Sequence, residues 1–206
     1  MSGKLLDPIP GLEFFSDLHR YRYKGRWLPF SVSRIASPVS PEVELRFEAT
    51  RHIWEPRGNA VHEYCEALLT GQERVKDEFS EWTDALDKCS LLRESEVVAA
   101  EYRMCDARKG VGGSFDFLLR KPNGQLVLGD LKTVGSVSAV SKRQPAKAQL
   151  GGYAAMLIDH HKLHIDLCCT LVCGPGKTRI LEQKTDECVS AWVDAWDFFK
   201  LDQGLF

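Results

Sequence analysis

Short hydrophobic runs separated by turn residues dominate the second half of the chain and indicate buried strands. The runs at residues 114–119 and 126–132 are apolar, β-branched or aromatic, and Lys-Pro-Asn-Gly-Gln separates them. A three-residue loop of Pro122, Asn123 and Gly124, with the glycine in a left-handed conformation, would join them as a hairpin. That loop places Asp116 opposite Asp130, whereas a two-residue loop would put the carboxylates on opposite faces.

The predicted hairpin brings three charged side chains together. Directly opposed residues have Cβ atoms about 5 Å apart, so Asp116 and Asp130 can bind one divalent cation. Lys132 lies two residues beyond Asp130 and therefore points to the same face. Charged strand residues usually form an exposed ionic face, but the strand around Asp130 is too apolar for one. A carboxylate in such a strand needs a cation or hydrogen bonds, which favours a metal site.

Helical periodicity precedes the hairpin. Glu55-Pro56-Arg57 predicts a helix start and Gly71 a helix stop, with an apolar stripe between them. His62 and Glu66 share the face beside this stripe. A lone histidine there is more often structural than a ligand, so the pattern alone leaves the role of His62 open. The stripe consists of Val61, Cys65, Leu68 and Leu69.

A second helix is predicted after the hairpin. Pro145 suits its first turn, and it continues to about residue 160 with Gln149 and Tyr153 on one face. The Gly151-Gly152 pair costs about 2 kcal/mol of helix propensity relative to alanine. Such a loss indicates that another backbone or a ligand comes close to the helix. The side chains expected to face the sheet are Leu150, Ala154, Leu157 and Ile158.

The order of these motifs resembles the PD-(D/E)XK nuclease superfamily. In that family the motif ends in acid, any residue, lysine, which here is Asp130-Leu131-Lys132, with Asp116 as the upstream acid. The RecB-like exonuclease branch also has a helix with a histidine, matched by residues 57–62. Its Gln-x-x-x-Tyr helix is matched by residues 149–153.

The resemblance extends to the N-terminal segment of small phage-type exonucleases in the same branch. Residues 19–26, followed by Ser31-Val32-Ser33, match that segment, although Pro29-Phe30-Ser31 departs from its more usual Pro-Ser-Val. The branch's cysteine ligands are missing here, so no iron–sulfur cluster is expected.

The resemblance implies a fold, a cofactor and residue roles. The expected fold class is α/β, a three-layer restriction-endonuclease-like core with a central mixed sheet within residues 96–183, flanked by helices that include residues 185–200. One or two Mg²⁺ or Mn²⁺ ions are expected, and Lys132 would orient the attacking water or stabilise the transition state. Gln149 and Tyr153 would position the DNA backbone. The expected metal ligands are His62, Asp116, Asp130 and the Leu131 carbonyl, and the expected catalytic residues are Asp116, Asp130, Lys132, Gln149 and Tyr153.

Further acids and a glycine-rich loop complete the expected site. A strand predicted at residues 96–104 carries Glu101, which by itself is most simply a solvated side chain. The resemblance makes Glu101 a candidate additional site residue, and Glu66 is a candidate for orienting His62. Residues 106–113 are expected to form a loop beside bound DNA, because glycine allows close approach.

Basic and aromatic side chains alternate in residues 19–27, a composition suited to stacking bases and contacting phosphates of a single strand. A hairpin turning at Lys24-Gly25 with exposed basic residues explains the same pattern. The net charge of −2 is unusual for a DNA-binding protein and requires the cations to be local. The expected DNA contacts are Arg20, Tyr21, Arg22, Tyr23, Lys142, Arg143 and Lys147.

Other features set limits. Gly174-Pro175-Gly176-Lys177-Thr178 ends like a phosphate-binding loop, but Leu171 stands where that motif needs glycine, so a hairpin turn is expected. Seven scattered cysteines in apolar surroundings predict reduced thiols in a cytosolic compartment, that of a bacterial host if the chain is phage-encoded. The 206 residues contain no linker, which predicts one nuclease domain at 1–206 with residues 1–50 packed on the core. No apolar run is long enough to span a membrane.

The sequence therefore predicts a metal-dependent deoxyribonuclease. An exonuclease acting in recombination, repair or degradation is favoured, with DNA that has a free end or is single-stranded as substrate and a recombination or replication protein as a candidate partner. A structure-specific endonuclease or junction resolvase with the same core is the alternative. A noncatalytic nucleic-acid-binding module is more distant, because such a module would be expected to have lost an acid or the lysine.

Overall fold

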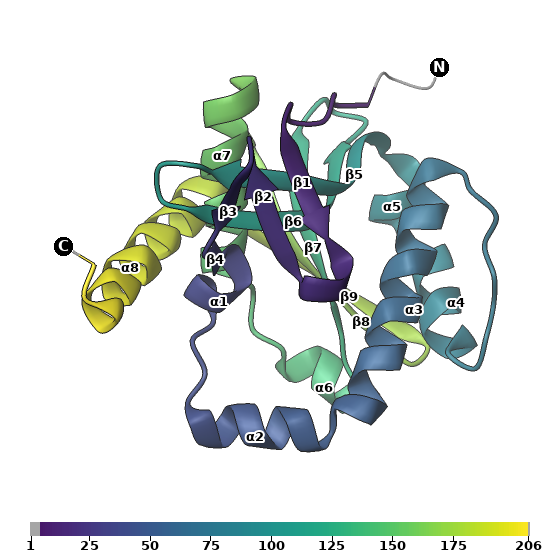
Figure 1. The fold of residues 1–206 in the computed structure, drawn as a ribbon. Helices are drawn as coiled ribbons and strands as arrows, with labels where there is room; N and C mark the ends of the chain where they lie inside the picture. The colour runs from purple at the N-terminus through teal and green to yellow at the C-terminus, as the bar shows by residue number, and fades with distance from the viewer. Residues whose placement is uncertain (1–4, 206) are drawn as a thin grey trace.

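The computed structural model describes residues 5–205, so residues 1–4 and 206 of the predicted domain lie outside it. The fold is α/β, with a central mixed sheet flanked by helices, as predicted (Figure 1). In chain order the elements are β1 (Leu12–Phe15), η1 (Ser16–Leu18), β2 (Arg20–Tyr23), β3 (Arg26–Leu28), β4 (Phe30–Ser31), α1 (Val32–Ala36), α2 (Pro41–Ala49), α3 (Arg51–Thr70), α4 (Ser80–Asp87), α5 (Ser90–Glu94), β5 (Glu96–Asp106), β6 (Val111–Arg120), β7 (Leu126–Thr133), α6 (Val137–Lys142), α7 (Lys147–His161), β8 (Leu167–Gly174), β9 (Lys177–Lys184) and α8 (Thr185–Gln203).

The main sheet contains a fork between β6 and β7. On one flank β6 pairs with β5, and on the other it pairs with β7, which is followed by β8 and β9. Pairing between β6 and β7 ends at Phe117 and Gly129. The short strand β4 pairs in parallel with β6 at Val111 and Gly112, on the flank that β7 has left. The two strands therefore diverge just beyond Phe117 and Gly129.

The register of the β6–β7 hairpin is the predicted one. Phe117 pairs with Gly129 and Arg120 with Leu126. The Lys121 N–H donates to the Gln125 carbonyl at 2.9 Å, which closes a three-residue loop, and Gly124 has a φ of 89°. Glycine is needed there because that φ lies in the left-handed region. Positions 116 and 130 come directly after the last pair, where the two strands begin to separate.

Two apolar layers cover the sheet. On one face α1, α7 and α8 pack over a cluster that includes Phe115, Leu128 and Leu150. On the other face α3, α4 and α5 pack over a cluster that includes Phe117 and Leu131. The switch of faces between Phe115 and Phe117 breaks strand alternation at position 116. Asp116 therefore lies at an irregular point of β6.

The expected close approach at Gly151 and Gly152 is confirmed. A Cβ on Gly151 would lie 1.9 Å from the Cys188 carbonyl oxygen, and one on Gly152 would lie 3.0 Å from the Trp192 ring. The neighbour is thus the backbone of α8, which packs on α7 (Figure 1). The glycine pair serves helix packing.

Two helix starts were predicted wrongly. α3 begins at Arg51 and Pro56 lies inside it, at an exposed position where the missing N–H costs one main-chain hydrogen bond. α7 begins at Lys147 and not at Pro145, because the Ala146 N–H donates to Thr170 Oγ1 at 2.8 Å instead of entering the helix. The predicted end of α3 at Gly71 is confirmed.

Half of the segment expected as a glycine-rich loop is strand. Residues 111–113 belong to β6, and only residues 107–110 connect it to β5. A Cβ on Gly112 would lie 2.5 Å from Tyr21 Cγ, and one on Gly113 would lie 2.7 Å from Tyr153 Cε1. These glycines admit aromatic rings, and the expectation that the segment lies beside DNA stays a prediction.

The small sheet β1–β2–β3 is built on a tight hairpin. Its turn is Lys24-Gly25, where both residues have positive φ, 47° and 79°, as in a type I′ turn. Tyr21 is buried together with Leu28 and Cys105. The hairpin interpretation of residues 19–27 is confirmed, and the prediction that Tyr21 stacks on bases is wrong because its ring is part of the core.

Two further expectations concern the C-terminal half and the thiols. Gly174 pairs with Lys177, so Pro175-Gly176 is a hairpin turn and not a phosphate-binding loop, as predicted. All seven cysteines are buried, free thiols. Among the described helices none is long and apolar enough to cross a membrane.

Candidate metal centre at the fork of the sheet

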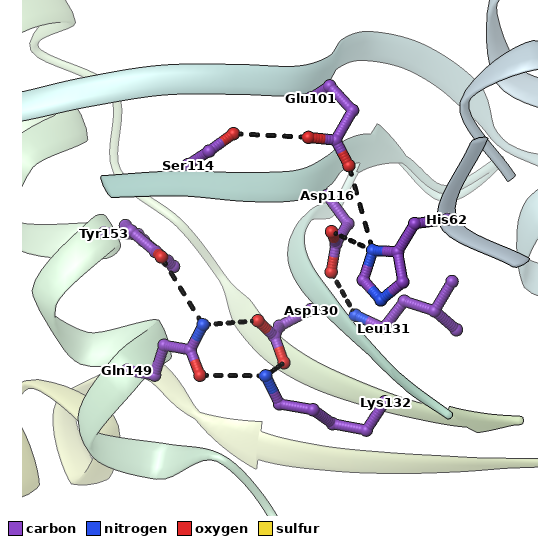
Figure 2. A network of polar contacts seen from close by, with 9 residues as sticks. All are labelled: His62, Glu101, Ser114, Asp116, Asp130, Leu131, Lys132, Gln149 and Tyr153. Atoms are coloured by element: carbon purple, nitrogen blue, oxygen red, sulfur yellow. Dashed lines mark hydrogen bonds and ion pairs between the residues drawn. The ribbon is translucent and has the colours of Figure 1, made fainter. Parts of the chain in front are cut away.

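Side chains from both faces of the sheet meet where β6 and β7 separate (Figure 2). α3 supplies His62 from one helical layer, and α7 supplies Gln149 from the other. An intact sheet would keep these two layers apart, so the fork is what lets their polar groups share one site. The strands add Glu101, Asp116, Asp130 and Lys132.

The first group of contacts is centred on Asp116. Its Oδ1 lies 2.9 Å from Nδ1 of His62, and its Oδ2 accepts a hydrogen bond from the Leu131 N–H. The side chain of Asp116 is 12% exposed and that of His62 33%. The Asp116 carboxylate thus contacts both α3, through His62, and β7, through Leu131. The Leu131 N–H bond fixes its orientation.

Glu101 joins this group from β5. The flanking pairs Ala100↔Phe117 and Tyr102↔Phe115 place Glu101 opposite Asp116. Its Oε1 lies 3.9 Å from His62 Nδ1, and its Oε2 accepts from Ser114 Oγ at 3.4 Å. Glu101 has a φ of 42°, which is unfavourable for a residue with a side chain and is typical of functional sites.

The second group of contacts is centred on Asp130, which is 2% exposed. Lys132 Nζ lies 2.8 Å from Asp130 Oδ2, and Gln149 Nε2 donates to Asp130 Oδ1 at 2.7 Å. Lys132 Nζ also donates to Gln149 Oε1 at 3.0 Å. Gln149 Nε2 lies 3.4 Å from the Tyr153 hydroxyl, which accepts from it. A closed ring of three polar side chains results, with Tyr153 behind it.

The site concentrates negative charge, which shifts several pKa values. Burial alone would lower the pKa of His62, but the charge and hydrogen bond of Asp116, with Glu101, raise it to about 10. Burial opposes ionisation of Asp116, yet the His62 charge holds the pKa of Asp116 below its usual value. Burial raises the pKa of Glu101 and of Asp130, and the neighbouring Asp116 charge adds to both rises. The proton on His62 compensates part of this charge.

The donor set at the fork fits a hard divalent cation. One ligand atom each from His62, Glu101 and Asp116 lies within 4.8 Å of the others. One imidazole nitrogen with carboxylate oxygens is a donor set that Mg²⁺ or Mn²⁺ accepts. Asp130, a predicted ligand, is instead held by Lys132 and Gln149. The sequence reasoning thus found two members of the cluster, while Glu101 was only an additional candidate.

Two other predicted site residues have indirect positions. Tyr153 is 1% exposed, so it acts on the site through Gln149 and does not reach a substrate itself. Among the described residues the partners of the His62 ring are Asp116 and Glu101, so Glu66 does not orient it.

The predicted DNA contacts differ in accessibility. Arg20 lies over the exposed Trp27 ring, 4.8 Å from its centroid. Arg22 forms an ion pair with Glu13 at 2.9 Å, and Lys147 pairs with Glu187 at 2.8 Å, so both charges are partly neutralised. Of the other predicted DNA contacts, Lys142 at the end of α6 and Arg143 just beyond it are exposed, and Tyr23 is half-buried.

Comparisons with known proteins leave the family open. No family model matches the chain, and no curated protein matches it. Among solved structures it is similar to the crystal structure of SSO0001, with 16% sequence identity, a TM-score of 0.44, and coverage of 82% of this chain and 75% of that chain. A likeness at this level carries no functional argument, so the function has to be argued from the site.

Proposed function

We propose that this protein is a metal-dependent deoxyribonuclease of the PD-(D/E)XK type and that it acts as an exonuclease. The observation that carries the proposal is the cluster of His62, Glu101 and Asp116, with ligand atoms within 4.8 Å, beside the Asp130–Lys132 pair. A divalent-cation site next to a lysine has the groups that phosphodiester hydrolysis requires. The ordered sequence motifs support the same assignment.

His62, Glu101 and Asp116 would hold the Mg²⁺ or Mn²⁺ ion, with Asp130 and the Leu131 carbonyl as further predicted ligands. Bound there, the ion would lower the pKa of a water molecule and neutralise charge on the scissile phosphate. Asp116 keeps its orientation through the Leu131 N–H. An ion bound there would replace the proton that His62 Nδ1 holds next to Asp116.

Lys132 and Gln149 supply the remaining polar groups. The Lys132 ammonium lies between Asp130 and Gln149, at 2.8 and 3.0 Å, so its direction is fixed before substrate arrives. A fixed cation of this kind stabilises negative charge that develops on the phosphate oxygens. Gln149, held by Tyr153, orients Lys132 and Asp130.

The recessed position of the acids favours a strand that can bend into the site. Asp130 and Gln149 are 2% and 7% exposed, while Glu101, His62 and Lys132 are only half-buried. A phosphodiester at a frayed or single-stranded end reaches such a site more easily than one in the middle of a duplex. This supports an exonuclease over an endonuclease or junction resolvase with the same groups.

The test is cleavage of end-labelled linear DNA and covalently closed circular DNA, single-stranded and duplex, with Mg²⁺, with Mn²⁺ and with EDTA. We expect the linear substrates to be degraded only with metal and the circles to persist. Lys132→Ala should abolish turnover, because it removes the cation beside Asp130, and Lys177→Ala, at the exposed β8–β9 turn, is the matched control.

Cleavage of closed circles by the unaltered protein would favour the endonuclease alternative. Binding of DNA without cleavage under every metal condition would favour the noncatalytic module. Equal turnover by Lys132→Ala and the unaltered protein would contradict the site itself.

A further inference from the structure

Arg57 occupies an unusual position at the far end of β7. Its Cζ lies 5.7 Å from the centroid of the Trp82 ring. Its Nη1 lies 3.3 Å from where a Cβ on Gly135 would stand. Trp82 donates from Nε1 to the Val134 carbonyl at 2.9 Å, which anchors the same loop. The guanidinium is thus held between an indole ring and the loop that follows Asp130-Leu131-Lys132.

Within the described part of the chain, the Arg57 guanidinium has no anionic partner. Arg57 Nε is buried and has no hydrogen-bond partner, and within residues 5–205 no carboxylate forms an ion pair with this side chain. Burial lowers the pKa of Arg57, although arginine stays protonated. A partly buried cation without compensation is costly, so such a position favours an anionic ligand. Five other arginines form ion pairs with acids, namely Arg22, Arg51, Arg74, Arg108 and Arg120.

Arg57 lies on the same helix as His62 and next to the loop that follows Lys132. Gly58 lies one turn before His62 on α3, and its Cβ position is 3.8 Å from Thr133 Oγ1, next to Lys132. Because Gly135 has no side chain, the guanidinium can lie against this loop. If a nucleic-acid strand places one phosphate at the metal centre, a neighbouring phosphate of the same strand would lie near Arg57.

We propose that Arg57 binds a backbone phosphate of the DNA strand close to the scissile one, as a positioning residue. This inference rests on the proposed function. Arginine suits the role because its planar fork binds phosphate oxygens in pairs. Stacking on Trp82 fixes the plane of the fork in advance, which lowers the entropy lost on binding.

The test separates binding from cleavage. Binding of a fluorescent single-stranded oligonucleotide is measured in EDTA over a range of salt concentrations for the unaltered protein, Arg57→Gln and Arg57→Lys. We expect Arg57→Gln to bind about tenfold more weakly and its salt slope to fall by about one, because one phosphate contact is lost. Arg57→Lys should keep the slope and lose only part of the affinity.

A second set of oligonucleotides identifies the phosphate. Each carries one uncharged methylphosphonate linkage at a different position. At one position the change should weaken binding by the unaltered protein and leave binding by Arg57→Gln unchanged, since the charge pair is already gone. Arg93→Gln is the matched control, because this exposed arginine precedes β5 at the opposite end of the sheet.

Several outcomes would overturn the inference. Unchanged affinity of Arg57→Gln, or equal weakening with every oligonucleotide and an unchanged salt slope, would leave Arg57 as a stacking partner of Trp82 only. If Arg57→Gln does not fold, Arg57→Lys with the methylphosphonate series decides the same question. DNA binding without cleavage contradicts the nuclease proposal and leaves the Arg57 test intact, whereas absence of any DNA binding contradicts both.

Discussion

At the scale of single residues, the two aspartates of the site have different hydrogen-bond and ion-pair partners. Asp116 contacts His62 and the Leu131 N–H, while Asp130 contacts Lys132 and Gln149. The two acids follow the last paired positions of β6 and β7, and each contacts a side chain from a different helix. Asp116 therefore belongs to the cluster that could bind a metal ion, together with His62 and Glu101. The charge of Asp130 is instead paired with the ammonium of Lys132.

Asp116→Asn should weaken Mn²⁺ binding by more than about tenfold, because it removes charge from the His62–Glu101 cluster. Asp130→Asn should have a smaller effect, since the ammonium of Lys132 already neutralises that carboxylate. Isothermal calorimetry measures both, with the exposed Asp186→Asn on α8 as control. Equal losses for the two site variants would mean that both acids bind the ion directly.

The pKa of His62 predicts how the stability of the metal-free protein depends on pH. Its folded-state pKa of about 10 lies above the usual 6.5, so the native state binds this proton more tightly than the unfolded chain. The resulting stability is complete below pH 6.5 and is lost as pH rises through about 10. Chemical denaturation in EDTA should show the free energy of unfolding falling from pH 6.5 to about 8, and less so in His62→Gln. Parallel curves for the two proteins would show that His62 is neutral in the native state.

At the scale of elements, close packing against the sheet decides where glycine is required. α7 lies against α8 at Gly151, where a Cβ would overlap the Cys188 carbonyl, whereas α3 has ordinary space at Gly58. Because α7 also carries Gln149, the α7–α8 contact sets the position of this side chain relative to Asp130. The packing of two helices thereby fixes part of the candidate site.

The same substitution should therefore have opposite effects in two helices. Gly151→Ala is expected to destabilise the protein by about 2 kcal/mol or more, because the backbone of α8 cannot yield easily. Gly58→Ala should stabilise it by about 0.5–1 kcal/mol through helix propensity. Urea denaturation gives both values. A neutral Gly151→Ala would indicate that α8 shifts at little cost.

At the scale of the whole molecule, the small sheet β1–β2–β3 packs against β5 and β6 of the main sheet, and its two faces differ. The small sheet carries Trp27, 41% exposed, with Arg20 stacked on it, while Tyr21 of the same hairpin packs into the core. Trp27 and Arg20 are therefore exposed to solvent, and this is the face that we propose for contact with bases. Neighbouring aromatic residues in one hairpin have different roles.

Trp27→Ala should weaken the binding of single-stranded DNA by about 1–3 kcal/mol if a base stacks on this ring, with little change in stability. Tyr21→Ala should lower the free energy of unfolding by about 3 kcal/mol or more, because a buried aromatic ring is removed. Fluorescence titration and thermal melting separate the two effects. Normal DNA affinity in Trp27→Ala would remove the small sheet from the proposed DNA contacts.

The sequence by itself determined the local parts of this protein. The Pro-Asn-Gly turn and strand alternation were enough to predict the register of the β6–β7 hairpin. The apolar stripe predicted the buried face of α3, and the glycine pair predicted a close neighbour for α7. These features follow from short-range steric preferences and from the periods of helix and strand, which can be read along the chain.

Only the tertiary structure decided which groups meet. Glu101 joins His62 through a distant strand pairing and a left-handed backbone conformation, and Tyr21 is buried because Gly112 admits its ring. Asp116 and Asp130 have separate partners because β6 and β7 stop pairing at Phe117 and Gly129, next to these two positions. Such contacts depend on burial and pairing between segments far apart in sequence, and those energies have no local signature.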